Sequence, residues 1–332
     1  MLFPTSDADA LLLAEHHDEL AQYCRLWSNT RDDLLSIVGK EQLYTRAVTG
    51  GVNVIPSIYR PTPEELQVWA DTHPDPYLIK PGYEGSPTNS LGKKNLSLDS
   101  RSELLAWAAQ TDTSELIIQR RLRGGDGNIF DCYGLCDSAG RIVTLATHRR
   151  WRQHLPDVGA TSFGEIPAGD ARIEPLIIEQ TRRLLGTVKY HGIFGIEWLH
   201  DVTTGEVYLI DFNARPFSTI SHLADCGLNL PHIAIMEIGG DALSSIPAMP
   251  ALQHKFWIDF TRDVETYTLK RENKEINLVR WLLSVLRCRS FAYWSWRDPG
   301  PALHQTLYLL RRIGRKGFHT AIAFIQFLPI DN

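Results

Sequence analysis

Two acidic residues, one amide and one arginine lie at spacings that could gather them on a β-hairpin. Residues 194–216 contain two runs of mixed apolar and polar residues, separated by the turn sequence Asp-Val-Thr-Thr-Gly. This pattern predicts two antiparallel strands joined by a turn centred near Thr204. Because residues that face each other across such a hairpin have a constant index sum, Glu197 should lie opposite Asp211.

The second strand of the hairpin predicts which side chains share its polar face. Side chains alternate along a strand, so Asp211, Asn213 and Arg215 should project to one side. Ile210 and Phe212 should then face the core. The resulting patch would hold two carboxylates, a carboxamide and a guanidinium.

The chemistry of this patch suits a hard metal ion and a phosphate group. Opposed carboxylates repel each other unless a cation lies between them, and oxygen ligands suit Mg²⁺. We therefore expect Glu197, Asp211 and Asn213 to bind Mg²⁺ (or Mn²⁺). Arg215 suits a phosphate or an acyl phosphate. The alternative is an ordinary polar hairpin face that is salt-bridged internally.

The arrangement Glu-x13-Asp-x-Asn-x-Arg at the end of a hairpin resembles the metal-binding signature of the ATP-grasp superfamily. Within that superfamily the chain resembles a group of predicted carboxylate–amine ligases that includes D-aspartate ligase. The resemblance implies an α+β fold in which two lobes hold ATP, here with a shortened N-terminal α/β piece and a helical C-terminal segment. Aspartate stands at position 211, where many members have a second glutamate.

The resemblance also implies nucleotide-binding residues elsewhere in the chain. Lys40 and Lys80 occur where the superfamily places two lysines near ATP, and a Gly- and Ser-rich loop at 82–92 follows. Backbone N–H groups of such a loop can bind phosphates. Residues 116–126 resemble the strand that borders adenine, where the superfamily often has an acid near the position of Gln119. The implied nucleotide contacts are Lys40, Lys80, Gln119, Arg120, Leu122, Asp126 and Leu199.

A run of arginines resembles the basic strand on the phosphate side of the superfamily's site. Arg149, Arg150 and Arg152 precede the sequence Leu-Pro-Asp-Val-Gly. Of the three we expect Arg152 to be catalytic, together with Arg215. The alternative for this run is a basic strand that faces solvent.

The elements that must position these residues alternate between helices and strands. Their order predicts an α+β protein with a largely antiparallel sheet. Helices are expected over 7–27, 31–49, 100–110 and 174–189, with another from Pro63, and strands over 77–80, 116–122, 129–135, 141–147 and the two arms of the hairpin.

Four parts of the chain are expected from this order and from the resemblance. They are an N-terminal remnant with a linking helix (1–60), a small ATP-grasp lobe (61–122), a large lobe with the metal site (123–250) and an aromatic, basic helical segment (251–332).

The bulk composition excludes several classes of protein. The chain has 332 residues, 43% hydrophobic and 22% charged, with a net charge of −5, so we expect a globular protein that binds no nucleic acid. Its five cysteines form no C-x-x-C pair, which favours buried thiols in a reducing compartment. The first residues lack a signal-peptide pattern, and no apolar run reaches the roughly 20 residues of a membrane span. A cytoplasmic location is therefore expected.

The C-terminal segment differs from the rest of the chain in charge. Residues 271–316 contain ten lysines and arginines against three acids, beside aromatic residues such as Trp281 and Trp294. A helical subdomain that packs its aromatics on the core is favoured over a membrane-surface contact. The sequence carries no pattern that specifies an oligomeric state.

These features together predict a Mg²⁺- and ATP-dependent ligase that activates a small-molecule carboxylate as an acyl phosphate and joins it to an amine. Two alternatives stay open: a degenerate ATP-grasp protein that binds nucleotide without ligase activity, and a carboxylase or kinase on the same scaffold. Replacement of Glu197 or Asp211 by alanine is expected to abolish ATP turnover and leave the fold intact.

Overall fold

The structure, a computed structural model, describes residues 1–81, 91, 95–122, 124–154, 159–295, 297–308 and 311. The predicted glycine-rich loop at 82–92, apart from Leu91, lies outside the described residues. The chain divides into two compact units. The first contains Met1–Trp151 and Gly164–Lys255, and the second contains Arg152–Phe163 and the chain from Phe256 onward.

Four helices begin the first unit: α1 (Asp7–Glu15), α2 (His17–Leu20), α3 (Arg31–Val38) and α4 (Lys40–Thr49). The helix predicted over 31–49 is interrupted at Gly39, whose ψ of 115° is extended. A Cβ atom at Gly39 would lie 2.9 Å from the Leu35 carbonyl oxygen, so only glycine fits this break without a shift. The break makes Lys40 the first residue of a new helix.

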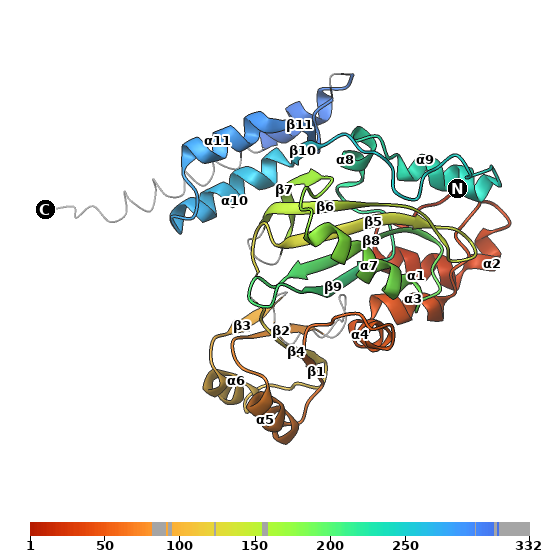
Figure 1. The fold of residues 1–332 in the computed structure, drawn as a ribbon. Helices are drawn as coiled ribbons and strands as arrows, with labels where there is room; N and C mark the ends of the chain where they lie inside the picture. Colours follow the sequence, from red (N-terminus) through yellow and green to blue (C-terminus); the bar gives the residue numbers. More distant parts are fainter. Residues whose placement is uncertain are drawn as a thin grey trace, which may run out of the picture. The chain divides into compact units, whose positions relative to one another are not determined.

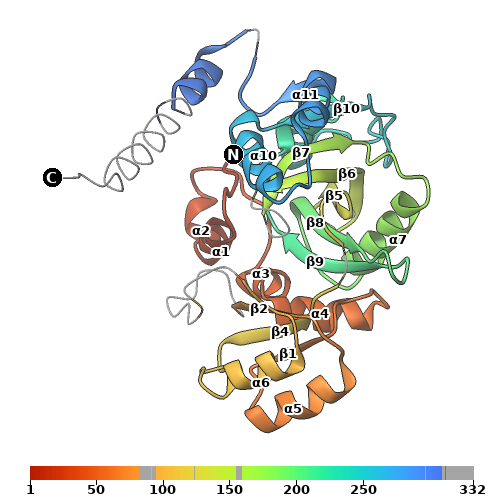
Figure 2. The same cartoon turned by 90° about the vertical axis from the view of Figure 1, so that its left-hand side faces the viewer.

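A small antiparallel sheet follows, with strands β1 (Ser57–Tyr59), β2 (Tyr77–Pro81), β3 (Leu96–Leu98) and β4 (Leu116–Arg120) in the order β1-β4-β2-β3. Helices α5 (Pro63–Thr72) and α6 (Arg101–Ala108) cover one face of it in both views (Figures 1 and 2). Leu66 and Leu104 of these helices pack on Ile79 and Ile118 of the sheet in one apolar core. These two helices therefore leave the other face of the small sheet uncovered by α5 and α6.

The larger sheet of the first unit runs β6-β5-β8-β9 and is antiparallel throughout. Its strands are β5 (Ile129–Cys136), β6 (Ile142–His154), β8 (Gly192–His200) and β9 (Val207–Asn213), and β7 (Ala160–Ile166) follows β6 in the chain. Helix α7 (Ile173–Leu185) packs on one face with Phe130 and Cys132, whereas α8 (Ile220–Asp225) and α9 (Leu230–Gly239) pack with Tyr133 and Leu135. Because side chains alternate along a strand, these helices lie on opposite faces.

The predicted hairpin is formed by β8 and β9 and contains a β-bulge. Near the turn Trp198 lies opposite Leu209. The residue before Trp198 in β8, Glu197, lies opposite Asp211, so one residue of β9 is skipped. Ile210 is therefore the extra residue of the bulge. The prediction that Ile210 faces the core is wrong, because the bulge turns its side chain into a partly exposed position, while Phe212 is buried as predicted.

The second unit is built around a buried carboxylate. It contains β10 (Lys255–Ile258) paired parallel with β11 (Cys288–Phe291), together with α10 (Phe260–Glu272) and α11 (Leu278–Arg287). The Asp263 carboxylate accepts hydrogen bonds from Arg152, Ser162 and the indole N–H of Trp281. Among the described residues, no helix of either unit is both long and apolar enough to cross a membrane.

Candidate active site

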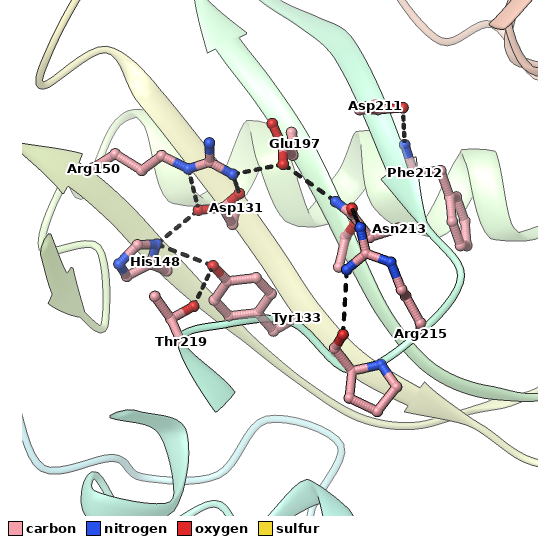
Figure 3. A network of polar contacts seen from close by, with 12 residues as sticks. Asp131, Tyr133, His148, Arg150, Glu197, Asp211, Phe212, Asn213, Arg215 and Thr219 are labelled. Atoms are coloured by element: carbon pink, nitrogen blue, oxygen red, sulfur yellow. Dashed lines mark hydrogen bonds and ion pairs between the residues drawn. The ribbon is translucent and has the colours of Figure 1, made fainter. Parts of the chain in front are cut away.

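Four polar side chains form a row across the larger sheet of the first unit, on the face opposite α7. Asp131 of β5 pairs with His148 of β6 on one side and with Glu197 of β8 on the other, and Glu197 pairs with Asp211 of β9. Directly opposed residues of antiparallel strands project to the same face. Three carboxylates are thus neighbours in one row, as Figure 3 shows for Asp131 and Glu197.

The positive charge of Arg150 links two of these carboxylates. Its Nε donates to Asp131 at 2.9 Å and its Nη2 contacts Glu197 Oε1 at 2.8 Å (Figure 3). Burial raises the pKa of Asp131, but Arg150 and a hydrogen bond from His148 lower it more, so the net pKa lies below its usual value. Burial lowers the pKa of Arg150, yet Asp131 and Glu197 raise it well above the usual value. The pair is therefore fully ionised at neutral pH.

Two lysines act on the third carboxylate. The Lys40 ammonium group at the start of α4 lies 3.0 Å from Asp211 Oδ1. Burial raises the pKa of Asp211, but the charge and hydrogen bond of Lys40 and the charge of Lys80 outweigh it, and the net pKa is lowered. Asp211 is ionised, and both lysines that the sequence singled out lie close enough to influence it.

The amide and the arginine that end the hairpin contact each other. Asn213 Nδ2 donates to Glu197 Oε1 at 3.2 Å, and Asn213 Oδ1 accepts from Arg215 Nη2 at 3.0 Å (Figure 3). Arg215 also forms an ion pair with Asp7 of α1, with Nε and Oδ1 3.0 Å apart. Three residues of the predicted hairpin patch, Glu197, Asn213 and Arg215, therefore form one network, and Asp211 lies opposite Glu197 on the neighbouring strand.

A buried tyrosine connects this network with the small sheet. The Tyr44 hydroxyl of α4 donates to the Leu209 carbonyl at 3.1 Å and accepts a 3.4 Å hydrogen bond from Gln119 Nε2 of β4. Gln119 Nε2 also donates to Ser57 Oγ of β1 at 2.8 Å. Gln119 Oε1 is buried and accepts no hydrogen bond from the described residues.

The other predicted nucleotide contacts lie on two sheets and the chain between them. Arg120 ends β4 opposite Tyr77, and Leu122 packs against the main core of the first unit. Asp126 lies in the turn before β5. Leu199 of β8 is only 8% exposed and shares the face of Glu197, two residues away. The roles of these side chains in nucleotide binding stay predictions.

Arg152 belongs to the second unit, where it has a different set of partners from Arg150. It makes two 2.8 Å hydrogen bonds to Asp263, and its guanidinium lies 4.2 Å from the centre of the Phe163 ring. Of the three arginines in the run, Arg150 is the one that contacts a predicted metal ligand, Glu197. The predicted catalytic role of Arg152 stays a prediction.

The predicted metal ligands suit a hard cation. Arg150 and Asn213 both contact Glu197 through Oε1, and a half-turn of the Asn213 amide would exchange its nitrogen for its oxygen. Among the described residues, no group of three or more His, Cys, Asp or Glu could hold a metal ion. Two carboxylates and one amide oxygen fit Mg²⁺, which usually retains waters and binds substrate phosphates.

Two residues of the row, Asp131 and His148, were not predicted from the sequence. The Asp137–Gly140 turn predicts a second hairpin, but the facing of Asp131 and His148 also depends on a register shift between Leu135 and Cys136 that the turn does not predict. An acid and a histidine opposed within two apolar strands indicate a buried polar pair. Tyr44 had no comparable signal, since nothing in its helix identifies the partners of its hydroxyl.

This chain is similar to known proteins in its three-dimensional structure and not in its sequence. The sequence matches no protein family model and no curated protein sequence. The fold is similar to that of N5-carboxyaminoimidazole synthetase from Staphylococcus aureus in complex with ADP, with a TM-score of 0.60 and 14% identity over 78% of this chain and 66% of that chain. It is also similar to biotin carboxylase from Campylobacter jejuni, with a TM-score of 0.59 and 16% identity over 74% of this chain and 56% of that chain.

A third solved structure agrees with these two. Carboxyaminoimidazole ribonucleotide synthase from Aspergillus clavatus in complex with ATP has a TM-score of 0.56 and 13% identity, over 73% of this chain and 61% of that chain. This chain therefore spans less than two thirds of each of the three. At these identities the likeness establishes the fold, and the α+β ATP-grasp fold expected from the sequence is confirmed.

Proposed function

We propose, from the ATP-grasp fold of this chain, that it is an ATP-dependent ligase that activates a carboxylate and transfers it to an amine. The observation that carries the proposal is the row of carboxylates beside basic side chains. Glu197 and Asp211 face each other across β8 and β9, with Arg150 contacting one and Lys40 contacting the other. A polyanionic substrate with a divalent cation complements such a mixture of charges.

The residues of the row have distinct roles in this proposal. Glu197, Asp211 and Asn213 would hold Mg²⁺ (or Mn²⁺), which when bound neutralises charge on the phosphates of ATP. Lys40 and Lys80, whose charges now act on Asp211, are then available to the phosphates. When the ligands bind, Asp211 would pair with the metal ion in place of Lys40, and Lys40 would pair with a phosphate. The local charge would therefore stay balanced.

The reaction would proceed in two displacements. An oxygen of the substrate carboxylate forms a bond to the γ-phosphorus of ATP, and the bond to the β,γ-bridging oxygen breaks, so ADP leaves with the electron pair. The amine nitrogen then attacks the acyl carbon and inorganic phosphate leaves, while the amine proton passes to a base. Arg150 and Arg215, which contact Glu197 and Asn213, would stabilise negative charge on the phosphoryl and acyl groups.

The nucleotide would contact residues of both sheets. Lys40, Lys80, Arg120 and Asp126 would bind its polar groups, with Leu122 and Leu199 against the base. The unsatisfied Oε1 of Gln119 could accept a hydrogen bond, which is consistent with a nearby donor on the ligand. Arg152 is kept as a candidate for a role in substrate binding. The residue ranges 1–60, 61–122, 123–250 and 251–332 remain our proposed division of the chain.

Trapping with hydroxylamine tests the acyl-phosphate step. Purified protein would be incubated with Mg²⁺, ATP, hydroxylamine and a panel of carboxylic acids, and hydroxamate and ADP would be measured. We expect equal amounts of hydroxamate and ADP with the correct acid, and loss of both in Asp211→Asn. ADP release without hydroxamate from any acid of the panel would contradict the carboxylate–amine assignment.

A carboxylase is the second candidate, because two of the similar structures carry that chemistry in their names. Biotin carboxylase and carboxyaminoimidazole synthetase both share this fold. In such a reaction bicarbonate would take the place of the carboxylic acid. Stimulation of ADP release by bicarbonate alone, with no hydroxamate from other acids, would favour this candidate.

A further inference from the structure

We propose that α11 of the second unit docks on an anionic phospholipid bilayer. The helix exposes most of its apolar side chains: Val279 is 66% exposed, Leu283 57% and Leu286 70%. An apolar helix face of this kind in water is unfavourable unless something covers it. The proposal is independent of the ligase chemistry, since every residue that it uses belongs to the second unit.

The exposed side chains form a continuous stripe along the helix. With 3.6 residues per turn, Leu278, Val279, Leu282, Leu283 and Leu286 occupy an arc of about 140°. The opposite side of the helix is anchored, because Trp281 stacks on Tyr267 of α10 with ring centres 4.7 Å apart and donates to Asp263 at 2.8 Å. The structure therefore fixes which face of α11 points outward.

Basic side chains border the stripe on one edge. On the same projection Arg280 and Arg287 lie just beyond Leu283, and both are exposed. No acidic residue occurs in the sequence between Glu275 and Asp298. Arg289 follows the helix and donates to the Leu286 and Cys288 carbonyls. An apolar stripe with a cationic edge is the pattern of a helix that lies in a membrane interface.

A hollow beside the helix could take a lipid headgroup. Its volume is about 620 Å³, and it combines guanidinium groups with apolar walls. Guanidinium groups bind phosphate oxygens through two parallel hydrogen bonds, and the apolar walls suit the start of an acyl chain. The hollow is lined by Phe256, Arg280, Leu283, Leu286, Arg287 and Arg289, together with Ser284.

Charge favours a lipid surface over a second copy of this chain. A symmetric dimer that packs α11 antiparallel on its copy would bring Arg280 and Arg287 of one copy close to the same residues of the other. An anionic bilayer instead supplies phosphates to those arginines and hydrocarbon to the leucines. Tyr293 and Trp294, 39% and 38% exposed, follow β11 and are residue types that favour the membrane interface.

Co-sedimentation of the full chain with vesicles tests the proposal. Vesicles of phosphatidylcholine with a minority of phosphatidylglycerol would be compared with pure phosphatidylcholine, at low and high salt. We expect binding to the anionic vesicles that weakens with salt. Arg280→Ala with Arg287→Ala should reduce binding by about 25-fold, taking about fivefold for each arginine. Leu283→Ser with Leu286→Ser should abolish detectable binding.

Matched variants of the first unit serve as controls. Arg141→Ala with Arg183→Ala removes two partly or fully exposed arginines, and Val48→Ser with Val68→Ser removes two apolar side chains that are 60% and 68% exposed. Both controls should bind vesicles as the unchanged protein does. The pair Arg280→Lys and Arg287→Lys, which keeps the charge, should retain most of the binding and separates charge from any loss of folding.

Three results would overturn the proposal. The first is that the full chain stays in the supernatant with anionic vesicles at low salt. The second is that both α11 variants bind like the controls, which would place the contact elsewhere. The third is that light scattering shows a dimer in solution that the Leu283→Ser and Leu286→Ser pair converts to a monomer, which would assign the stripe to a second copy.

Discussion

At the scale of single residues, the row across the sheet holds three carboxylates whose mutual repulsion would destabilise the fold without nearby cations. Asp131, Glu197 and Asp211 are neighbours on one face, and like charges directly opposite each other are destabilising. Arg150 lies between the first two and Lys40 pairs with the third. The basic residues therefore offset the repulsion within the folded sheet, and in our proposal they also bind a substrate of opposite charge.

Asp131 is expected to be the most important of the three carboxylates for stability. It is fully buried and accepts hydrogen bonds from Arg150 and His148. Replacing Asp131 by asparagine leaves a buried guanidinium with reduced compensation, which should lower the free energy of unfolding by about 3–5 kcal/mol. Urea denaturation followed by circular dichroism measures this change.

The pH dependence of this loss has a defined sign. Because the pKa of Asp131 is lowered in the folded state, its contribution is complete above its ordinary unfolded value of about 3.9 and disappears as pH falls toward the lowered value. The difference between the unchanged protein and Asp131→Asn should be constant near neutral pH and shrink below about pH 4. The exposed pair of Asp71 and Arg101 is the control, and Asp71→Asn should cost at most about 1 kcal/mol. Equal losses for the two variants would contradict the account.

The residue scale also shows how far the sequence could predict the site. The facing of Glu197 and Asp211 was predictable because both belong to one hairpin with a recognisable turn. The contact between Lys40 and Asp211 depends on how α4 packs against β9, and only the resemblance indicated that Lys40 belongs to the site. Arg150 and Arg152 are two residues apart on β6 and so share one face, and the sequence offered no physical reason to choose between them.

At the scale of elements, the site depends on the close packing of four strands. The bulge at Ile210 brings Asp211 opposite Glu197, where a regular ladder from Trp198 and Leu209 would have placed position 210. The break at Gly39 separates α3 from α4 and sets Lys40 at a helix start. Periodicity predicts the helices and strands but is insensitive to such single-residue irregularities, which is why both were missed.

A glycine in the central strand β5 gives a prediction at this scale. A Cβ atom at Gly134 would lie 2.5 Å from both the Thr144 carbonyl oxygen and the Phe194 ring. Since a strand on each side prevents relief by movement, Gly134→Ala should destabilise the protein by about 1–3 kcal/mol. Chemical denaturation measures it.

Gly186 at the end of α7 is the matched control for Gly134. A Cβ atom there would meet only carbonyl oxygens of the same helix, at 3.3 Å and beyond. Gly186→Ala should therefore change the free energy of unfolding less than Gly134→Ala does. A Gly134→Ala protein that is as stable as the Gly186→Ala protein would show that the central strand tolerates more movement than the structure implies.

At the scale of the whole molecule, the chain combines an ATP-grasp fold with a C-terminal unit of different character. The fold class was predictable because its signature, the hairpin with Glu, Asp, Asn and Arg, lies in one continuous stretch. The second unit was predicted only as helical, aromatic and basic. Its buried Asp263 and the outward face of α11 depend on contacts between distant segments, for which composition gives no direction.

The central claim is that the row of carboxylates and its lysines bind Mg²⁺ and ATP together. The melting temperature of the unchanged protein and of Asp211→Asn, measured with saturating ATP in Mg²⁺ or in EDTA, tests it most directly. Ligand at about 100 times its Kd should stabilise the folded state by about 2.7 kcal/mol, or several degrees. We predict that the unchanged protein shows this increase only with Mg²⁺ and that Asp211→Asn does not. No increase in the unchanged protein, or the same increase in EDTA and in Asp211→Asn, would contradict the claim.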